Sequence, residues 1–308
     1  MPLTPTKKIW MDGKLVPWEK ATTHVLSHTL HYGTGAFEGI RAYSNADGVA
    51  VFRLRDHMIR LLRSCKILMI DVPYTLNELC EATVETIKVN DLKDGCYIRP
   101  LVFLGYGEMG INPLASPVNV AIAAWPWGPY FGEHELEHGV RAKISSWTRH
   151  SPNAMPSASK TIGGYVNSSL AKVEALKAGY DEAIMLGADG RVSECTGENL
   201  FIVNNGVLIT PPPSEAGALR GVTQESVVRI ANDLGYRVNF DAMVRTDLYL
   251  ADEAFLTGTA AEIVPIHSVD DRVVGEGKPG PITKSVQSTY FQAVHGELSQ
   301  YESWLTRI

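Results

Sequence analysis

Asp-Gly and Asn-Gly dipeptides between short apolar runs recur along this chain of 308 residues and constrain its fold more than any other feature. Such dipeptides favour the two-residue turns of β-hairpins, because both residues readily adopt the positive φ angles that these turns require. Strands joined in this way run antiparallel. We therefore predict hairpins around Asp12-Gly13 and Asp47-Gly48, and a meander over residues 182–211 with turns at Asp189-Gly190 and Asn205-Gly206.

Helical periodicity alternates with these hairpin signals. Apolar residues at helical spacing predict a helix over residues 54–65, and Thr75 with Glu78 forms a capping box at the start of a second helix. Val166, Leu170 and Val173 have the spacing of one buried helix face, which Gly179 would end. Further helices are predicted over residues 223–234 and 282–294, and the apolar runs 96–105 and 118–127 are predicted to be central strands.

This mixture of elements predicts a mixed α/β (α+β) fold in two domains. Glycines and charges over residues 128–139 interrupt the pattern, so we place an interdomain linker there. The predicted division is a smaller N-terminal domain over residues 1–127 and a larger C-terminal domain over residues 140–308.

The composition excludes several classes of function. A net charge of −6 and a pI near 5.9 provide no basic stripe for a nucleic-acid backbone. The start, MPLTPTKKIWMDG, lacks the apolar segment of a signal peptide, and no apolar run approaches the ~18 residues of a membrane span. We therefore expect a cytoplasmic protein that acts on small molecules and has neither nucleic-acid nor membrane partners.

Some motifs resemble binding sites but lack the surroundings that such sites need. GYGEMG, residues 105–110, matches the dinucleotide pattern G-x-G-x-x-G, yet Asn112-Pro113 follows where the pyrophosphate-binding helix should begin. Three histidines within residues 24–31 share a helical spacing, but no carboxylate completes a metal-ligand set. The four cysteines form no C-x-x-C pair, and Cys195 has no identified histidine partner. We predict neither a dinucleotide site, nor a metal site, nor a thiol role.

Lys160 is the main candidate for a chemical role. It precedes the helix predicted from Val166 and lies among small residues at 157–159 and 163–164, which leave room for a ligand to approach its amine. An amine is nucleophilic only when neutral, and the main use of a buried lysine amine is a Schiff base. The partner can be a substrate carbonyl or pyridoxal phosphate, and Lys160 alone leaves both open.

Pyridoxal phosphate requires a phosphate site and a carboxylate for its ring nitrogen. Two glycine turns offer free amides and hydroxyls to a phosphate: residues 219–226, which enter a helix near Thr223, and residues 256–263, which contain Thr259. Glu194, which follows a hairpin turn, is a candidate for the ring nitrogen.

Nine ordered motifs carry a resemblance to a known family. They are HYGTGAFEGIRAY, RLRDHMIRL, YIRPL, AAWPWG, SKTIGGYVNS, SECTGENLF, LRGVTQ, LTGTAAEI and GPIT, between Trp10 and Phe291. In order and spacing they resemble the branched-chain amino acid aminotransferases, pyridoxal-phosphate enzymes of fold type IV (class IV). The resemblance implies a smaller N-terminal α/β domain and a larger C-terminal α/β pseudo-barrel that binds pyridoxal 5′-phosphate. It also implies ping-pong transfer of an amino group between L-leucine, L-isoleucine or L-valine and 2-oxoglutarate.

The resemblance implies cofactor contacts residue by residue. Lys160 would form the Schiff base and, once displaced by the amino acid, would move a proton between the substrate Cα and the cofactor C4′. Glu194 would pair with the pyridine nitrogen, and the Tyr165 hydroxyl would point to the cofactor oxygen. The phosphate would be held by Arg60, Leu219, Val222, Thr223 and Thr259.

The implied substrate pocket combines an apolar wall with groups that bind carboxylates. The wall would consist of Phe37, Trp127, Tyr130 and Tyr165, completed by Tyr32, Met109 and Ile111 from a second copy of the chain. Tyr97, with Thr259 and Ala260, would bind the α-carboxylate. Arg99 would bind the distal carboxylate of glutamate. Because loops would cross between copies, the resemblance implies at least a homodimer and leaves a hexamer open.

Close alternatives share the same lysine and glutamate. D-amino acid aminotransferases and aminodeoxychorismate lyases differ in their pocket walls, and FEGIRAY with YIRP and AAWPWG favours the L-branched-chain type. A cofactor-free Schiff-base lyase or a ligand-binding protein is a more remote alternative. Cys195 and Thr196 depart from the small residues expected beside Glu194.

Overall fold

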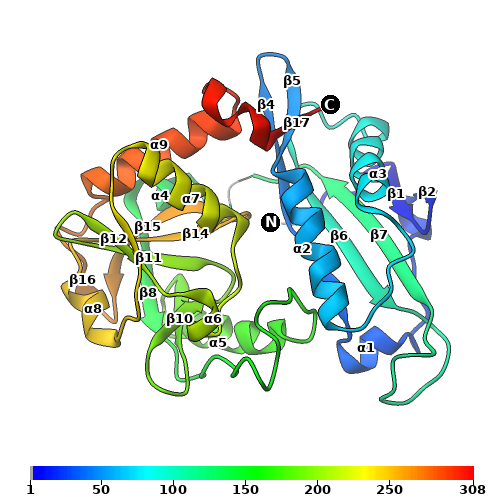
Figure 1. The fold of residues 1–308 in the computed structure, drawn as a ribbon, viewed down its shortest axis with the longest axis horizontal. Helices are drawn as coiled ribbons and strands as arrows, with labels where there is room; N and C mark the ends of the chain where they lie inside the picture. The colour runs from blue at the N-terminus through cyan, green and yellow to red at the C-terminus, as the bar shows by residue number, and fades with distance from the viewer. Residues whose placement is uncertain (1–2, 129) are drawn as a thin grey trace. The chain divides into compact units, whose positions relative to one another are not determined.

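The computed structural model describes residues 3–128 and 130–308 (Figure 1). The chain divides into two compact units. Unit 1 comprises Met1–Trp127, Ser159–Gly164 and Ala293–Ile308, and unit 2 comprises Gly128–Ala158 and Tyr165–Gln292. Each unit has its own sheet and its own hydrophobic core. The predicted mixed α/β fold class is confirmed.

Unit 1 is built on one antiparallel sheet with the strand order β17-β5-β4-β6-β7-β1-β2, and β3 pairs with β6. The hairpins predicted around Asp12 and Asp47 are present as β1–β2 and β4–β5, and the two apolar runs are the neighbouring strands β6 and β7. The strands are β1 (Lys8–Met11), β2 (Lys14–Pro17), β3 (Gly35–Phe37), β4 (Ile40–Asn45), β5 (Gly48–Phe52), β6 (Cys96–Leu104), β7 (Val118–Trp125) and β17 (Leu305–Arg307).

Two helices, α2 (Leu54–Ile67) and α3 (Leu76–Val89), pack on this sheet (Figure 1). The predicted apolar face of α2 is buried. Its four residues, Leu54, Met58, Leu61 and Cys65, are each at most 1% exposed. At the start of α3 the predicted capping box is present, with the Thr75 side chain accepting from the Glu78 N–H. The remaining helices of the unit are short: η1 (Trp18–Lys20), α1 (His28–Tyr32) and η2 (Ser299–Trp304).

Two segments that are distant in sequence complete unit 1. Thr161 forms a bridge with Ala36 of β3, and β17 pairs with β5. The division predicted from sequence assigned both segments to residues 140–308. The structure groups them with unit 1 because backbone hydrogen bonds join them to its strands. It also places a helix of unit 2, α4 (Glu133–His138), where the sequence predicted a linker.

Unit 2 contains a mixed sheet with the order β10-β9-β8-β15-β14-β11-β12-β13, and β16 pairs with β15. The pairs β8–β9, β8–β15 and β12–β13 are parallel, and the others are antiparallel. The strands are β8 (Val140–Ile144), β9 (Glu182–Leu186), β10 (Val192–Cys195), β11 (Asn199–Asn204), β12 (Val207–Thr210), β13 (Val238–Phe240), β14 (Glu253–Gly258), β15 (Glu262–Val269) and β16 (Arg272–Val273).

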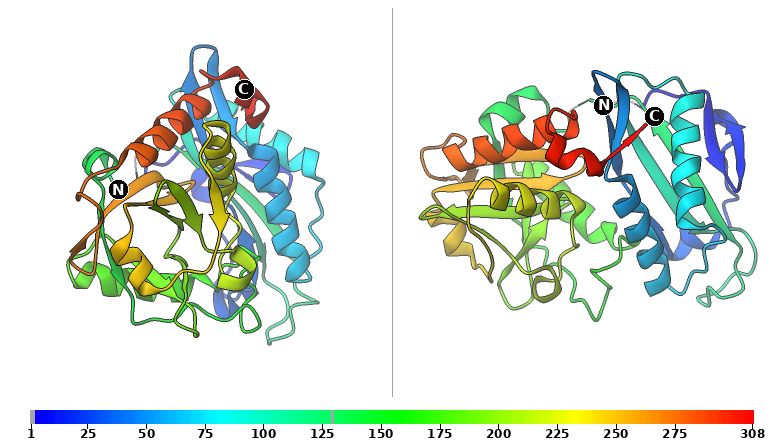
Figure 2. Two further views of the ribbon diagram at one scale, coloured as in Figure 1. Left: turned by 60° about the vertical axis from the view of Figure 1, so that its left-hand side comes forward. Right: turned by 45° about the horizontal axis from the view of Figure 1, so that its top comes forward.

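The edges of this sheet meet. Val192 N–H of β10 donates to the Met243 carbonyl at 2.8 Å, and Arg191 forms a bridge with Val244, just beyond β13. The sheet therefore curls back on itself, as the view at the left of Figure 2 shows. This is the pseudo-barrel that the family resemblance implied.

The helix predicted after Lys160 is present as α5 (Tyr165–Lys177), but its predicted buried face is wrong. Val166, Leu170 and Val173 are 63%, 41% and 49% exposed. The helix packs on β9 through small residues instead, among them Ala171 and Ala175, because small side chains allow close approach to the strand. The other helices are α6 (Pro213–Ala216), α7 (Val222–Asp233), α8 (Arg245–Leu250) and α9 (Pro281–Val294).

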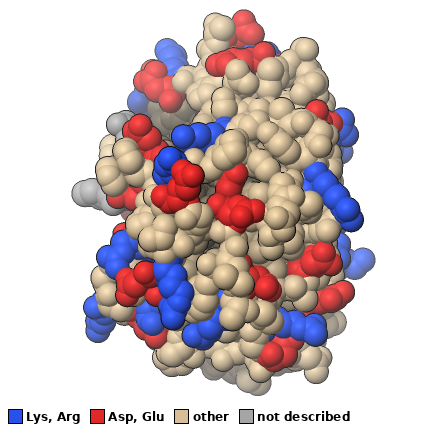
Figure 3. Space-filling view, turned by 90° about the vertical axis from the view of Figure 1, so that its left-hand side faces the viewer, with Lys and Arg blue, Asp and Glu red and all other residues tan. Residues whose placement is uncertain are grey.

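Acidic and basic side chains are interspersed, without strong segregation, on the face drawn in Figure 3. Over residues 3–128 and 130–308, no helix is both long and apolar enough to cross a membrane.

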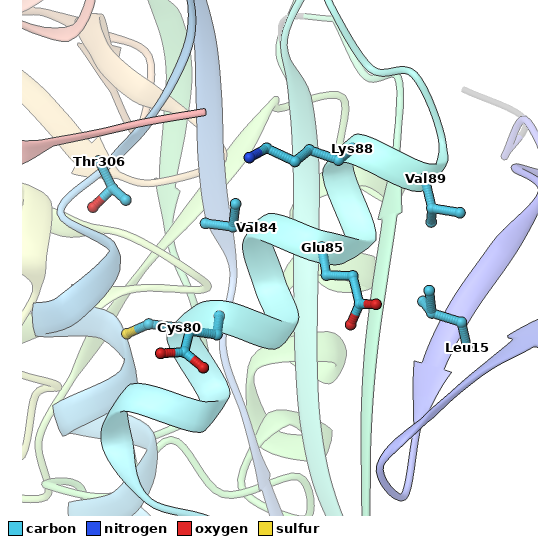
Figure 4. A pocket seen from close by; sticks show the side chains of 8 residues that line it. Leu15, Cys80, Val84, Glu85, Lys88, Val89 and Thr306 are labelled. Carbon is cyan, nitrogen blue, oxygen red and sulfur yellow. The ribbon is translucent and has the colours of Figure 1, made fainter.

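A groove of about 720 Å³ lies beside α3, between Leu15, Val84 and Thr306 (Figure 4). None of the residues predicted to bind cofactor or substrate lines this groove.

Candidate active site

Lys160 is held in unit 1 from both sides of its backbone. Its N–H donates to Ser64 Oγ of α2 at 3.0 Å, and its carbonyl accepts from the Phe37 N–H of β3 at 3.1 Å. The half-buried side chain places Nζ 5.1 Å from the centre of the Phe37 ring. A helix and a strand therefore fix the backbone of Lys160, which the sequence could place only in a loop.

Arg60, which was predicted to bind phosphate, forms a bidentate ion pair with Glu38. Its Nε and Nη2 donate to the two carboxylate oxygens at 2.6 and 2.8 Å, and His57 Nδ1 lies 2.8 Å from Glu38 Oε2. Burial would raise the pKa of Glu38, but Arg60 and His57 outweigh it and hold that pKa well below its usual range. Burial also lowers the pKa of His57, against the opposing effect of Glu38. The phosphate role of Arg60 stays a prediction.

Sequence reasoning missed Glu38 and His57. Both lie within motifs already quoted, and His57 and Arg60 are three residues apart on α2, so they share one helix face. Nothing in the sequence pairs that face with Glu38, which precedes His57 by 19 residues.

Four predicted substrate residues lie together in unit 1. The Arg99 guanidinium lies 4.8 Å from the centre of the Phe37 ring, and Nη2 donates to the Tyr97 hydroxyl at 3.3 Å. The Tyr97 and Trp127 rings meet edge to face, 4.4 Å apart. A side chain at Gly39 would place its Cβ 2.0 Å from the Tyr97 hydroxyl, so a glycine is required there. Aromatic faces and a guanidinium therefore adjoin one another.

Tyr32, Met109 and Ile111, predicted to complete a neighbouring copy's pocket, are 44%, 48% and 85% exposed. The last two lie in residues 105–117, which connect the antiparallel strands β6 and β7 without a helix. The G-x-G-x-x-G sequence at 105–110 therefore has neither the helix nor the parallel strands of a dinucleotide site.

In unit 2, Glu194 at the end of β10 is bound by three groups. Arg149 Nη2 lies 2.6 Å from Glu194 Oε1, the Leu219 N–H donates to Oε2 at 3.0 Å, and Asn199 Nδ2 lies 3.5 Å from Oε2. Asn199 also donates to the Leu219 carbonyl at 2.9 Å. Glu194 and Arg149 are 6–10% exposed. These contacts orient the carboxylate; sequence reasoning missed Arg149 because it precedes Glu194 by 45 residues.

Two of the predicted phosphate residues of unit 2 lie where backbone amides have no partner within a helix. Helix α7 begins at Val222, so the N–H groups of Val222 and Thr223 have no partner within the helix. A side chain at Gly221 would place its Cβ 2.0 Å from Asn199 Oδ1, which explains the glycine at this entry. Thr259 and Ala260 lie in the three-residue connection 259–261 between β14 and β15.

Two further predicted residues, Tyr165 and Tyr130, also belong to unit 2. Tyr165 is the first residue of α5, and Tyr130 packs edge to face on Phe131. Cys195, whose place beside Glu194 was unexpected, is buried, and burial followed by the charge of Glu182 raises the pKa of its thiol well above the usual value. The thiolate form is therefore strongly disfavoured.

Comparisons with known proteins identify the family. The profile of the family described as amino-transferase class IV matches residues 35–269. The chain is 45% identical over 300 residues to a branched-chain-amino-acid aminotransferase of Pseudomonas aeruginosa, with 97% of each chain covered. It belongs to the class IV aminotransferases.

Two solved structures are similar to this class IV aminotransferase. The branched-chain amino acid aminotransferase of Escherichia coli has a TM-score of 0.95 and 46% identity, covering 98% of this chain and 99% of the other. The T.th. branched-chain amino acid aminotransferase complexed with N-(5′-phosphopyridoxyl)-L-glutamate has a TM-score of 0.93 and 46% identity, covering 98% of each chain.

Proposed function

We propose that this class IV aminotransferase moves an amino group between a branched-chain L-amino acid (leucine, isoleucine or valine) and 2-oxoglutarate. The observation that carries the proposal is the Phe37 ring, which has Lys160 and Arg99 within 5.1 and 4.8 Å of its centre. An aromatic wall suits an aliphatic side chain, and a guanidinium suits a second carboxylate. The names of the relatives and the glutamate adduct in the T.th. enzyme support both halves of the proposal.

The cofactor is pyridoxal 5′-phosphate, as in other class IV aminotransferases. The donor groups fit it: an amine at Lys160, free amides at the start of α7, and the oriented carboxylate of Glu194. When bound, the cofactor supplies an electron sink for the negative charge that develops at the substrate Cα.

The residues of the chain bind, orient and transfer protons around that group. Lys160 Nζ would hold the cofactor and, as a free amine, would carry a proton to and from the substrate Cα. Glu194, oriented by Arg149, would hold the ring nitrogen by a hydrogen bond. The amides of Val222 and Thr223, with Leu219, Arg60 and Thr259, would hold the phosphate, and the Tyr165 hydroxyl would hold the ring oxygen.

The substrate groups act in the same way for both half-reactions. Phe37 and Trp127 of unit 1, and Tyr130 and Tyr165 of unit 2, are the aromatic residues that the resemblance assigns to the aliphatic side chain. Tyr97, Thr259 and Ala260 bind the α-carboxylate common to all substrates, and Arg99 binds the distal carboxylate of glutamate or 2-oxoglutarate.

The test is an absorption spectrum of the purified holoenzyme before and after L-leucine, followed by 2-oxoglutarate. We expect L-leucine to bleach the long-wavelength cofactor band and 2-oxoglutarate to restore it. Bleaching by D-alanine alone would assign the chain to the D-specific branch, and release of pyruvate from aminodeoxychorismate would assign it to the lyases. If the protein shows no long-wavelength band even after pyridoxal phosphate is added, the remaining alternatives are a cofactor-free Schiff-base lyase or a ligand-binding protein.

We also infer a homodimer, at least, from the exposed Tyr32, Met109 and Ile111. Light scattering in solution tests this, and a monomer that is fully active would overturn it. A hexamer is a second outcome of the same measurement. The cytoplasmic location stays a prediction from the sequence.

A further inference from the structure

A buried cluster of charges in unit 2 has no part in the function described so far. Glu182 of β9 is fully buried and Glu198 is 5% exposed, while Lys172 of α5 is half-buried. Lys172 Nζ lies 2.6 Å from Glu182 Oε2 and also donates to the Asp181 carbonyl at 2.6 Å. Lys172 therefore pairs directly with Glu182 and also interacts electrostatically with Glu198.

Glu182 uses its other oxygen to hold the turn between β10 and β11. Thr196 Oγ1 donates to Glu182 Oε1 at 2.6 Å, and the Thr196 N–H lies 3.4 Å from the same oxygen. The turn, residues 196–198, is closed by the Cys195 N–H donating to the Glu198 carbonyl at 2.8 Å. Hydrogen bonds to a carboxylate are about twice as strong as neutral ones, so this contact is a firm anchor for the turn.

The anchored turn has a functional residue at each end. Glu194 lies two residues before it, and Asn199, which contacts Glu194 and the Leu219 backbone, directly follows it. A displacement of Thr196 would therefore move the carboxylate proposed for the ring nitrogen.

Lys172 holds in place the Glu182 carboxylate that anchors Thr196. A buried carboxylate that loses its cation is strongly destabilised where it lies, so removing the ammonium would release this restraint on the turn. The ammonium is itself held by aromatic rings, 4.9 Å from the centre of Phe131 and 5.6 Å from that of Tyr130.

We propose that Lys172 is a positioning residue of the transaminase: through Glu182 and Thr196 it fixes the turn that orients Glu194. The proposal rests on the proposed function. The proposal also explains Thr196, which was not expected near Glu194: its hydroxyl donates the hydrogen bond through which Glu182 restrains the turn.

The test compares holoenzymes carrying Lys172→Met, Lys172→Arg and Thr196→Val with the wild type. Lys172→Met removes the charge and keeps the length, so kcat for L-leucine should fall between about tenfold and 100-fold with little change in KM, as for a displaced catalytic group. Lys172→Arg should restore most of the rate. Lys177→Met, an exposed lysine on the same helix, is the matched control and should leave the rate unchanged.

A spectroscopic readout separates positioning from general damage. If Glu194 moves away, the ring nitrogen of the cofactor loses its proton. The nitrogen that joins the lysine to the cofactor then becomes more basic. The pH midpoint of the long-wavelength band should therefore rise in Lys172→Met and Thr196→Val, but not in Lys177→Met. The double variant should be little worse than either single variant, because both changes break one chain of contacts.

Three results would overturn the proposal: an unchanged midpoint in both single variants, normal kcat in Thr196→Val, or additive losses in the double variant. If Lys172→Met does not fold, Thr196→Val carries the test alone, since it changes a single hydroxyl. If the wild type does not turn over L-leucine, the proposed substrate fails, whereas the midpoint comparison still decides the role of Lys172.

Discussion

Each unit contains a buried glutamate, but the balance of positive and negative charges around that glutamate differs between the units. In unit 1, the Glu38 carboxylate meets a guanidinium and an imidazole, and its pKa falls well below the usual range despite complete burial. In unit 2, burial and the charge of Glu182 raise the pKa of Glu198 to about 8, although Lys172 opposes this. Burial acts in the same direction on both carboxyl groups, so the number of neighbouring cations decides the outcome.

The two carboxyl groups make opposite contributions to stability as pH changes. The pKa of Glu38 is lower in the folded protein than in the unfolded chain, so ionised Glu38 stabilises the protein at neutral pH. This contribution is lost as the pH falls from the unfolded-state pKa toward the lower folded-state pKa. Glu198 binds a proton in the folded state up to about pH 8 but not when unfolded above about 4.5, so its contribution decreases as pH rises through that window.

The largest effect is expected where a cation of unit 1 has a chemical role. Lys160→Ala should lower turnover by about 10² to 10⁴-fold or more, because both the covalent bond and the proton transfer are lost. Lys160→Arg keeps the positive charge and should be equally inactive, since a guanidinium is always protonated. Steady-state kinetics with L-leucine measure both variants. An active arginine variant would show that Lys160 contributes only a positive charge and neither the covalent bond nor the proton transfer.

Next comes the ion pair of Glu38. Arg60→Met leaves a fully buried carboxylate without its guanidinium and should lower the free energy of unfolding by about 3–5 kcal/mol. Adding Glu38→Gln should recover part of the loss, and the exposed Arg63→Met on the same helix serves as the control. Urea denaturation of the cofactor-free protein measures this without any contribution from phosphate. Equal stability of Arg60→Met and Arg63→Met would remove the contrast between the units.

Arg99 tests whether the positive charge of unit 1 serves the acidic substrate. Arg99→Ala should reduce kcat/KM for 2-oxoglutarate by roughly tenfold to 100-fold, the range of a lost hydrogen bond to a charged group. The value for 4-methyl-2-oxopentanoate, the oxo acid of leucine, should change much less. Equal losses for both oxo acids would count against a specific contact with the distal carboxylate.

The smallest effect concerns Glu198. Glu198→Gln should match the wild type near pH 5, where the carboxyl group is protonated, and should be the more stable protein above pH 8. Thermal unfolding from pH 5 to 9 gives the comparison, and Glu297→Gln, outside the buried cluster, is a suitable control. Parallel curves for wild type and Glu198→Gln would show that Glu198 is not protonated in the folded protein.

Local signals predicted elements well where a residue and its partner are close in sequence. The capping box at Thr75 and the turns at Asp12 and Asp47 depend on contacts within a few residues, and each is present. The helix after Lys160 was also predicted, but periodicity marked Val166 and Leu170 as buried when they are exposed. A stripe of apolar residues shows that a face exists, whereas the packing partner decides which face is buried.

The sequence by itself determined the fold class, the family and the candidate residues around Lys160 and Glu194, because these rest on local turn chemistry and on ordered motifs. Only the tertiary structure decided which groups surround them. Glu38 reaches Arg60 from the connection between β3 and β4, Arg149 reaches Glu194 across 45 residues, and Lys172 reaches Thr196 through Glu182. Electrostatic interactions depend on distance in space, and the separation of two residues along a chain does not define that distance.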